Sequence, residues 1–191
     1  MNDGLNVNRR RTLLGAAFVG AHLLGLGAAS AETIAPRPYR VVWPTGWDVS
    51  YLPSPTTNSG KNLGGERARV LLKGEGGAFA AAIELTHFPR SDKGRSNLTE
   101  EFDLLRGNLQ AGYERQRFEV QLTPTQEQAI GGLPALTTEL SVTNDNTHLM
   151  QWLGVALSPQ FFYALTFTAR AENFARYRPQ FDAVTRSMAF K

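Results

Sequence analysis

The chain has 191 residues and no cysteine, with 20 basic and 17 acidic side chains and a formal net charge of +3. The lack of cysteine excludes a disulfide framework and any thiolate site. Arg9 to Arg11 lie in the first segment with only one acidic residue, Asp3, so the chain from Glu32 onward has a net charge of +1. This nearly balanced charge argues against a nucleic-acid-binding protein.

The N-terminal segment has the three parts of an export signal. Positive charges come first, a glycine-diluted apolar stretch follows, and small residues suited to a signal peptidase close it at Ala29 and Ala31. We predict a cleavable signal over residues 1–31 and a periplasmic or secreted protein without a stable membrane anchor. The general export route and an uncleaved signal stay open as alternatives. Paired arginines followed after one residue by two leucines resemble the twin-arginine motif, and these residues are Arg10, Arg11, Leu13 and Leu14.

Residues 32–191 are long enough to form a single domain with its own core. Residues 39–43 predict a first strand, Pro44-Thr45-Gly46 a tight turn, and residues 47–52 the return segment of a hairpin. A loop rich in Pro, Ser, Asn and Gly is predicted over residues 53–65. Strands over residues 69–73 and 79–88 flank a glycine-rich turn that lacks the lysine of a phosphate-binding loop.

A helix is predicted from Asn97, which stands three residues before Glu100 as in a capping box. Apolar residues then recur at intervals of three and four, which places them on one helical face. They are Leu98, Phe102, Leu105, Leu109 and Tyr113.

Strand-like segments dominate the second half of the chain. Residues 118–122 and 126–130 precede three successive strands, from Leu136 to Val142 and over residues 147–157 and 161–169, which predict an antiparallel meander. The chain closes with an amphipathic helix. Because Pro179 interrupts its pattern, we expect the helix either to start near Tyr177 or to bend. The predicted fold class is α+β, an antiparallel β-sheet covered by two main helices.

Three local patterns resemble the PsbP-like fold. They are Trp43-Pro44-Thr45-Gly46-Trp47, Ile130-Gly131-Gly132-Leu133-Pro134-Ala135, and Tyr177 with residues 181–187 of the terminal helix. Within that fold the chain is most similar to a small exported proteobacterial family catalogued as a domain of unknown function. The resemblance covers nearly all of residues 32–191 and implies an α/β/α sandwich. It implies a role as an assembly factor, a subunit of a complex or a small binding protein, with no catalytic residue and no cofactor.

Few side chains suggest chemistry. His87 and His148 are the only histidines after the signal and stand on separate hairpins, so no metal site is predicted. Glu84 and Glu139 lie on predicted strands and could approach one another, although their alternation with apolar neighbours favours the solvent face. A hydrolase that uses Glu84 or Glu139 with His87 or His148 stays open as one alternative function.

Aromatic side chains are the remaining candidates for binding. Trp43, Trp47 and Tyr51 lie close together in the sequence, and Phe162 lies on the meander. We predict that these four residues contribute to a patch for a protein partner or a small ligand. The leading function is therefore a non-enzymatic exported protein that binds or scaffolds a partner. The other alternative is a small-molecule-binding protein with an aromatic cleft near Trp47.

Overall fold

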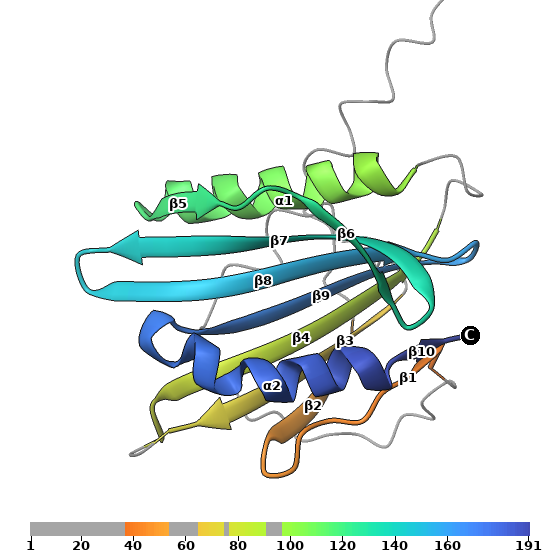
Figure 1. Cartoon of the computed structure of the whole chain (residues 1–191), viewed down its shortest axis with the longest axis horizontal. Coiled ribbons are helices and arrows are strands. Elements are labelled where there is room, and N and C mark those ends of the chain that lie inside the picture. Colours follow the sequence, from red (N-terminus) through yellow and green to blue (C-terminus); the bar gives the residue numbers. More distant parts are fainter. Residues whose placement is uncertain (1–36, 54–64, 75–76, 91–96) are drawn as a thin grey trace, which may run out of the picture.

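An eight-stranded antiparallel sheet with one helix on each face forms the body of the protein (Figure 1). The computed structural model describes residues 37–53, 65–74, 77–90 and 97–191, so the predicted signal and most of the predicted loop lie outside the described residues. The strand order is β2-β3-β4-β9-β8-β7-β5, and β6 also pairs with β7. The predicted α+β class is confirmed.

The described residues form ten strands and two helices. The strands are β1 (Tyr39–Arg40), β2 (Asp48–Pro53), β3 (Glu66–Lys73), β4 (Phe79–Pro89), β5 (Glu119–Leu122), β6 (Gln126–Ile130), β7 (Leu133–Asn144), β8 (Thr147–Leu157), β9 (Phe161–Arg170) and β10 (Ala189–Phe190). The helices are α1 (Leu98–Arg115) and α2 (Ala171–Ser187). Neither of the two described helices is long and apolar enough to cross a membrane.

Side chains alternate between the two faces of the sheet and form two apolar clusters. In β9, Tyr163, Leu165 and Phe167 belong to the cluster under α2, whereas Phe162 and Ala164 belong to the cluster under α1. A strand whose residues are apolar on both faces is expected in a sheet that is covered on both sides. This alternation decides which helix each predicted site residue can face.

Helix α1 follows its sequence prediction closely. The Asn97 side chain accepts a hydrogen bond from the Glu100 backbone nitrogen at 2.9 Å and thereby caps the first turn. The predicted apolar face is buried through Phe102, Leu105 and Leu109, which pack in the cluster formed with β7 and β8. Both the start and the orientation of α1 therefore follow from local sequence signals.

Helix α2 begins at Ala171 and runs through Pro179 to Ser187, so the predicted alternative of a start near Tyr177 is wrong. Aromatic packing on both sides of the proline explains the continuity. The Phe167 ring lies 5.0 Å from that of Phe174 and 4.9 Å from that of Phe181, measured between ring centroids. Both halves of α2 are thus docked on the same strand, which holds them in one helix despite the missing backbone donor.

The predicted N-terminal hairpin is wrong. Only Tyr39–Arg40 forms a strand, and it pairs with β10 at the other end of the chain, while β2 pairs with β3. The Val42 backbone nitrogen donates to the Ser187 hydroxyl at 2.9 Å, which ties the segment between β1 and β2 to the end of α2. Pairing with a distant segment therefore replaces the local return that the turn residues suggested.

Candidate functional site

Two of the four aromatic residues predicted to form a patch lie together beside strand β2. The Trp43 indole nitrogen donates to the Tyr51 hydroxyl at 3.0 Å. On the same tyrosine, the Arg37 guanidinium carbon lies 3.5 Å from the ring centroid, a cation–π contact. We call Arg37, Val42, Trp43, Val49 and Tyr51 the edge patch.

Trp47 and Phe162 do not belong to the edge patch. Trp47 is buried and its ring meets that of Tyr177 edge-on, with centroids 6.2 Å apart. Phe162 lies on the opposite face of the sheet, where it packs 6.2 Å from Phe88 under α1. The four-residue patch is corrected to Trp43 and Tyr51, because Trp47 fills the core and the alternation of β9 turns Phe162 away.

The edge patch contains all the large apolar side chains that are exposed in the part of the chain that the structure describes. These are Val42, Val49 and Tyr51. Val49 and Tyr51 point to the α2 side of the sheet, because their register partners Val70 and Ala68 are buried in the cluster under that helix. Strand β2 is also the last strand in the order, so its outer edge has no strand partner among the described residues.

A partly buried ion pair holds Arg37 of the edge patch in place. Arg37 binds both carboxylate oxygens of Glu66, with a distance of 3.0 Å between Nη2 and Oε2. The Tyr39 hydroxyl donates to the same carboxylate at 3.4 Å, and burial together with the Glu66 charge raises the pKa of Tyr39. The phenol therefore remains a donor to Glu66, and the Glu66 carboxylate holds Arg37 over the Tyr51 ring.

His87 lies next to this ion pair, in the aromatic core. Its ring centroid is 5.5 Å from that of Tyr39, 5.8 Å from Phe161 and 6.4 Å from Tyr163. Burial lowers the pKa of His87, and its Nδ1 atom has no hydrogen-bond partner among the residues that the structure describes. His87 is thus a neutral core residue on the α2 side of the sheet.

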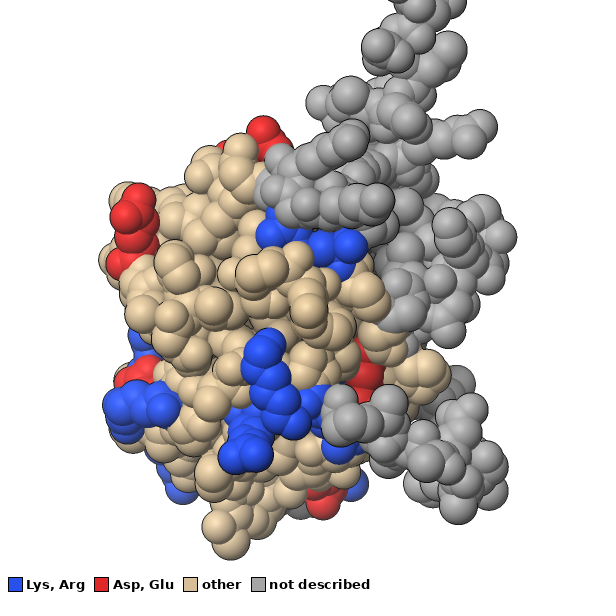
Figure 2. Space-filling view, turned by 90° about the vertical axis from the view of Figure 1, so that its right-hand side faces the viewer, with Lys and Arg blue, Asp and Glu red and all other residues tan. Residues whose placement is uncertain are grey.

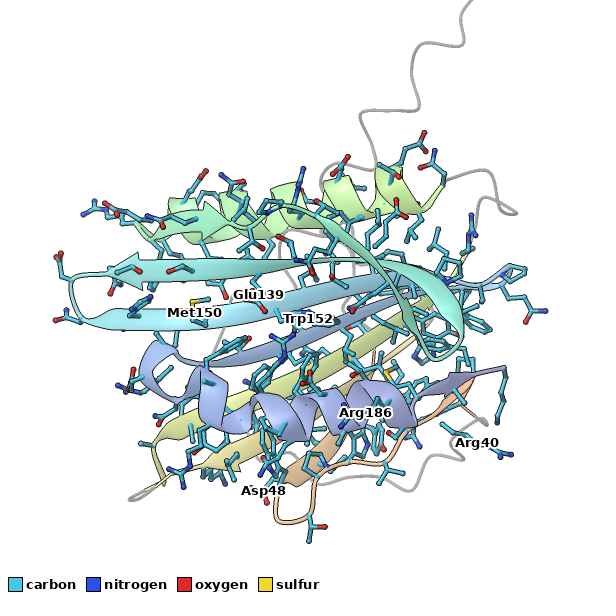
Figure 3. The ribbon with its side chains drawn as sticks, in the orientation of Figure 1. Arg40, Asp48, Glu139, Met150, Trp152 and Arg186 are labelled. Atoms are coloured by element: carbon cyan, nitrogen blue, oxygen red, sulfur yellow. The ribbon has the colours of Figure 1, made fainter. Side chains whose placement is uncertain are left out.

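The two carboxylates considered for catalysis lie on opposite faces of the sheet. Glu139 faces α2, where it pairs with Arg178, and Figure 3 shows it close to its register neighbour Trp152. Glu84 faces the other way, pairs with Arg69 at 3.3 Å, and has a pKa that burial raises. The alternative in which Glu84 and Glu139 approach one another is therefore excluded, and the expectation that Glu84 faces solvent is wrong. The alternation of side chains predicts which face of the sheet a residue lies on, but not which face is covered by other parts of the chain.

His148 lies at the far end of β8 from the edge patch and is exposed. Its Nε2 atom is 3.0 Å from the Ser141 hydroxyl, but no described carboxylate orients the other ring nitrogen. Among the described residues, no group of three or more His, Asp or Glu side chains could hold a metal ion. The four residues considered for a hydrolase are therefore not assembled into one site.

A shallow groove of about 490 Å³ opens between the first turn of α1 and the β6–β7 hairpin. Leu98 and Thr99 form its helical side, and Glu127, Gln128 and residues 134–136 form the strand side. None of the predicted site residues lines it.

The chain matches one protein family, described as Domain of unknown function (DUF4946), over residues 38–190. No curated protein matches it significantly. The family match agrees with the resemblance seen in the sequence.

Several solved structures are similar to this one. One is LpqN of Mycobacterium tuberculosis, described as involved in cell envelope biogenesis, with 11% identity, TM-score 0.47, and 80% of this chain and 83% of that chain covered. Another is PA94 of Pseudomonas aeruginosa, a protein of unknown function, with 13% identity, TM-score 0.41, and 72% and 79% covered. A third is the cyanobacterial PsbP of Synechocystis sp. PCC 6803, with 13% identity, TM-score 0.44, and 87% and 99% covered.

Proposed function

Since the chain belongs to the family described as Domain of unknown function (DUF4946), whose description assigns no activity, we propose a role that rests on its own surface. The protein is an exported, non-enzymatic binding protein that holds an extended segment of a partner protein along strand β2. The observation that carries this proposal is the edge patch, where all the exposed large apolar side chains of the described chain gather.

Strand β2 has the geometry that strand addition needs. A strand at the end of a sheet presents unpaired N–H and C=O groups along its outer side, and an extended segment can pair with them. Val49 and Tyr51 stand at alternate positions and would contact alternate side chains of that segment. Arg37 and Trp43 hold Tyr51 in place, which reduces the entropy lost on binding.

The charges near the edge patch favour an acidic and apolar segment. Arg40 is exposed in β1, and Arg186 is exposed in the last turn of α2, which leads into the strand that pairs with β1. The structure gives neither arginine a described carboxylate within ion-pair distance. Figure 2, which faces the end of the molecule where β1 and β10 lie, shows Lys and Arg side chains close together. Opposite charges on the partner would speed and orient its binding.

The non-enzymatic part of the proposal is supported by the scattered positions of the catalytic candidates. Glu84 and Glu139 lie on opposite faces of the sheet, and His87 lies in the aromatic core. The export part rests on the twin-arginine-like pattern of residues 1–31.

Site-specific photo-crosslinking tests the proposed surface. The photoreactive residue p-benzoylphenylalanine replaces Val49 or Tyr51 in the full chain, which is expressed and crosslinked in its host. As a matched control it replaces Gln121, an exposed residue in β5 at the opposite edge of the sheet. We expect adducts with one partner at positions 49 and 51 and none at position 121. Mass spectrometry should map the adducts to a segment of that partner that is acidic and apolar.

Charge variants complete this test. Tyr51→Glu should remove the adduct formed at position 49, because it places an acidic group against an acidic segment, whereas Gln121→Glu should leave it unchanged. Adducts only with a second copy of this chain, or equal adducts at both edges of the sheet, would contradict the proposal.

A further inference from the structure

Polar side chains cover part of the sheet on the face opposite α2. Strand register places Ser50, Arg69, Glu84 and Thr166 in one row across four strands, with Ser50 opposite Arg69, Arg69 opposite Glu84 and Glu84 opposite Thr166. Helix α1 contacts β5, β7 and β8 on this face, so the row lies beside the strands that α1 covers. We call the whole set the polar half-face: Ser50, Arg67, Arg69, Glu84, Thr86, Gln151, Thr166 and Thr168.

The polar half-face is not an ordinary solvent-exposed surface. Ser50 is exposed, but 26% of the Arg69 side chain, 16% of the Glu84 side chain and only 2% of Thr166 remain accessible. Accessibility along the row thus decreases from Ser50, at the edge of the sheet, to Thr166 in β9. Burying polar groups without partners costs stability, so a buried polar lining in place of an apolar one points to a ligand.

Two buried donor groups of the polar half-face have no hydrogen-bond partner among the described residues. One is the Thr86 hydroxyl, in a residue that is only 1% exposed. The other is Arg69 Nε, because its 3.3 Å approach to Glu84 lacks hydrogen-bond geometry. Glu84 supplies the set's only carboxylate. The ligand that would satisfy these groups is therefore an acceptor.

A chain of hydrogen bonds adds a further donor two positions along β9. The Tyr113 hydroxyl lies 3.5 Å from Gln151 Oε1, and Gln151 Nε2 donates to the Thr168 hydroxyl oxygen at 2.8 Å. Burial, with the Glu84 charge, raises the pKa of Tyr113 to about 12, so the phenol keeps its proton. The Thr168 hydroxyl hydrogen is then left to donate to a ligand that extends beyond the row.

We propose that the polar half-face binds a small ligand through an oxyanion, a carboxylate or a phosphate group, with Arg69 as the charged contact and the Thr86 hydroxyl as a buried donor. This site lies on the other face of the sheet from the side chains of the edge patch, and it goes beyond the proposed partner binding. The planar guanidinium and the hydroxyl are the groups that recognise such oxyanions in proteins.

Glu84 gives the site a dependence on pH. The groups that face it are Arg67 and Arg69 from β3, Tyr113 from α1 and the uncharged Thr166 from β9. Burial raises the pKa of Glu84, and the two arginines oppose this effect. A bound anion would raise this pKa further, so binding and protonation of Glu84 favour each other. The affinity for an oxyanion should fall as the pH rises through the pKa of Glu84.

Calorimetry on the exported protein tests this site with inorganic phosphate in one arm and succinate in the other, at constant ionic strength. We expect at least one of them to bind, and Arg69→Gln to weaken that binding at least tenfold. Glu84→Gln should tighten it and remove the part of its pH dependence that the Glu84 carboxyl contributes. Arg176→Gln, which removes an exposed charge from α2 on the other face, is the matched control and should leave the affinity unchanged.

Thr86→Val separates a ligand contact from a structural role. The valine has nearly the same shape and removes a buried hydroxyl that has no partner, so the variant should fold with at least parental stability. We nevertheless expect it to bind the anion several-fold more weakly. Binding of neither anion, or equal affinities in Thr86→Val, Arg69→Gln and the parent, would overturn the proposal. Neither result bears on the crosslinks at β2.

Discussion

Gly65 stands where two backbones approach too closely for a side chain. A Cβ atom at this position would lie 2.2 Å from the carbonyl oxygen of His87 and 3.3 Å from the Cα atom of Phe88. Backbone atoms of paired strands cannot move aside without breaking the ladder that holds them. The start of β3, and with it Glu66 beneath the edge patch, depends on this glycine.

Gly65→Ala should therefore lower the free energy of unfolding by about 1–3 kcal/mol, as overpacking does in other tightly packed sites. Urea unfolding measures the change. Gly107→Ala is the matched control, because a Cβ atom there meets nothing within 4 Å. The control should gain about 0.5–1 kcal/mol, since alanine is the better helix former in α1. Equal stabilities of Gly65→Ala and the parent would contradict the close approach.

His87 should make the protein less stable in mild acid. Its pKa is lowered by burial in the folded state, below its ordinary value of 6.5. The unfolded chain then takes up the proton more readily, so the free energy of unfolding falls as the pH drops through about 6.5 toward the folded-state pKa.

His87→Phe should remove this loss, because phenylalanine fits among Tyr39, Phe161 and Tyr163 and carries no titratable group. Urea unfolding at pH values on both sides of the transition measures the difference between variant and parent. His148→Gln, which changes an exposed histidine, should retain the parental loss. An acid sensitivity that persists unchanged in His87→Phe would assign it to another group.

At the scale of elements, α2 is held together by what it packs against. Pro179 is exposed in the middle of this helix and cannot donate to the preceding turn. Phe174 and Phe181, on the two sides of the proline, are both buried against β9. Arg178 also forms an ion pair with Glu139 of the sheet and a second one with Asp182 within the helix.

Pro179→Ala should consequently raise the free energy of unfolding, by about 1–3 kcal/mol, because it restores a backbone donor where the helical geometry already exists. Thermal unfolding followed by circular dichroism measures the gain. Gln180→Ala, at the next exposed position, is the control and should change stability by only a few tenths of a kcal/mol. A destabilised Pro179→Ala would indicate that α2 needs a bend at this position.

The sequence predicted local features of the elements better than their partners. The Asn97 cap and the spacing from Phe102 to Tyr113 identify α1, since both signals lie within a few turns of one helix. The role of β1 could not be predicted in this way, because Tyr39 pairs with Phe190, 151 positions along the chain.

The candidate sites show the same limit. Trp43 and Tyr51 are close in sequence and meet in the structure, whereas Phe162 shares only its aromatic character with them and packs under α1. Side chains alternate between the two faces along a strand, which places Glu84 on the opposite face from Ile83. This alternation does not show that the Glu84 side chain is largely buried. Burial depends on the whole order of strands, which no local pattern contains.

At the scale of the whole molecule, the predicted export signal would determine where the two proposed binding surfaces operate. Replacing Arg10 and Arg11 by lysine keeps the positive charge but changes the paired arginines that the twin-arginine route reads. We expect the double variant to accumulate in the cytoplasm as uncleaved precursor. Fractionation and N-terminal sequencing measure this, and the exported parental protein should begin at Glu32. A variant that is exported normally would favour the general route.

The pairing of β1 with β10 has a consequence for synthesis. Phe190 packs 4.0 Å from the Tyr163 ring, and the Lys191 backbone nitrogen donates to the Pro38 carbonyl oxygen at 2.9 Å. These contacts cannot form until residues 189–191 have left the ribosome, so the fold of the described residues is completed only after the sheet and both helices have been synthesised. A chain that stops before Ala189 would lack these contacts and leave Tyr163 uncovered.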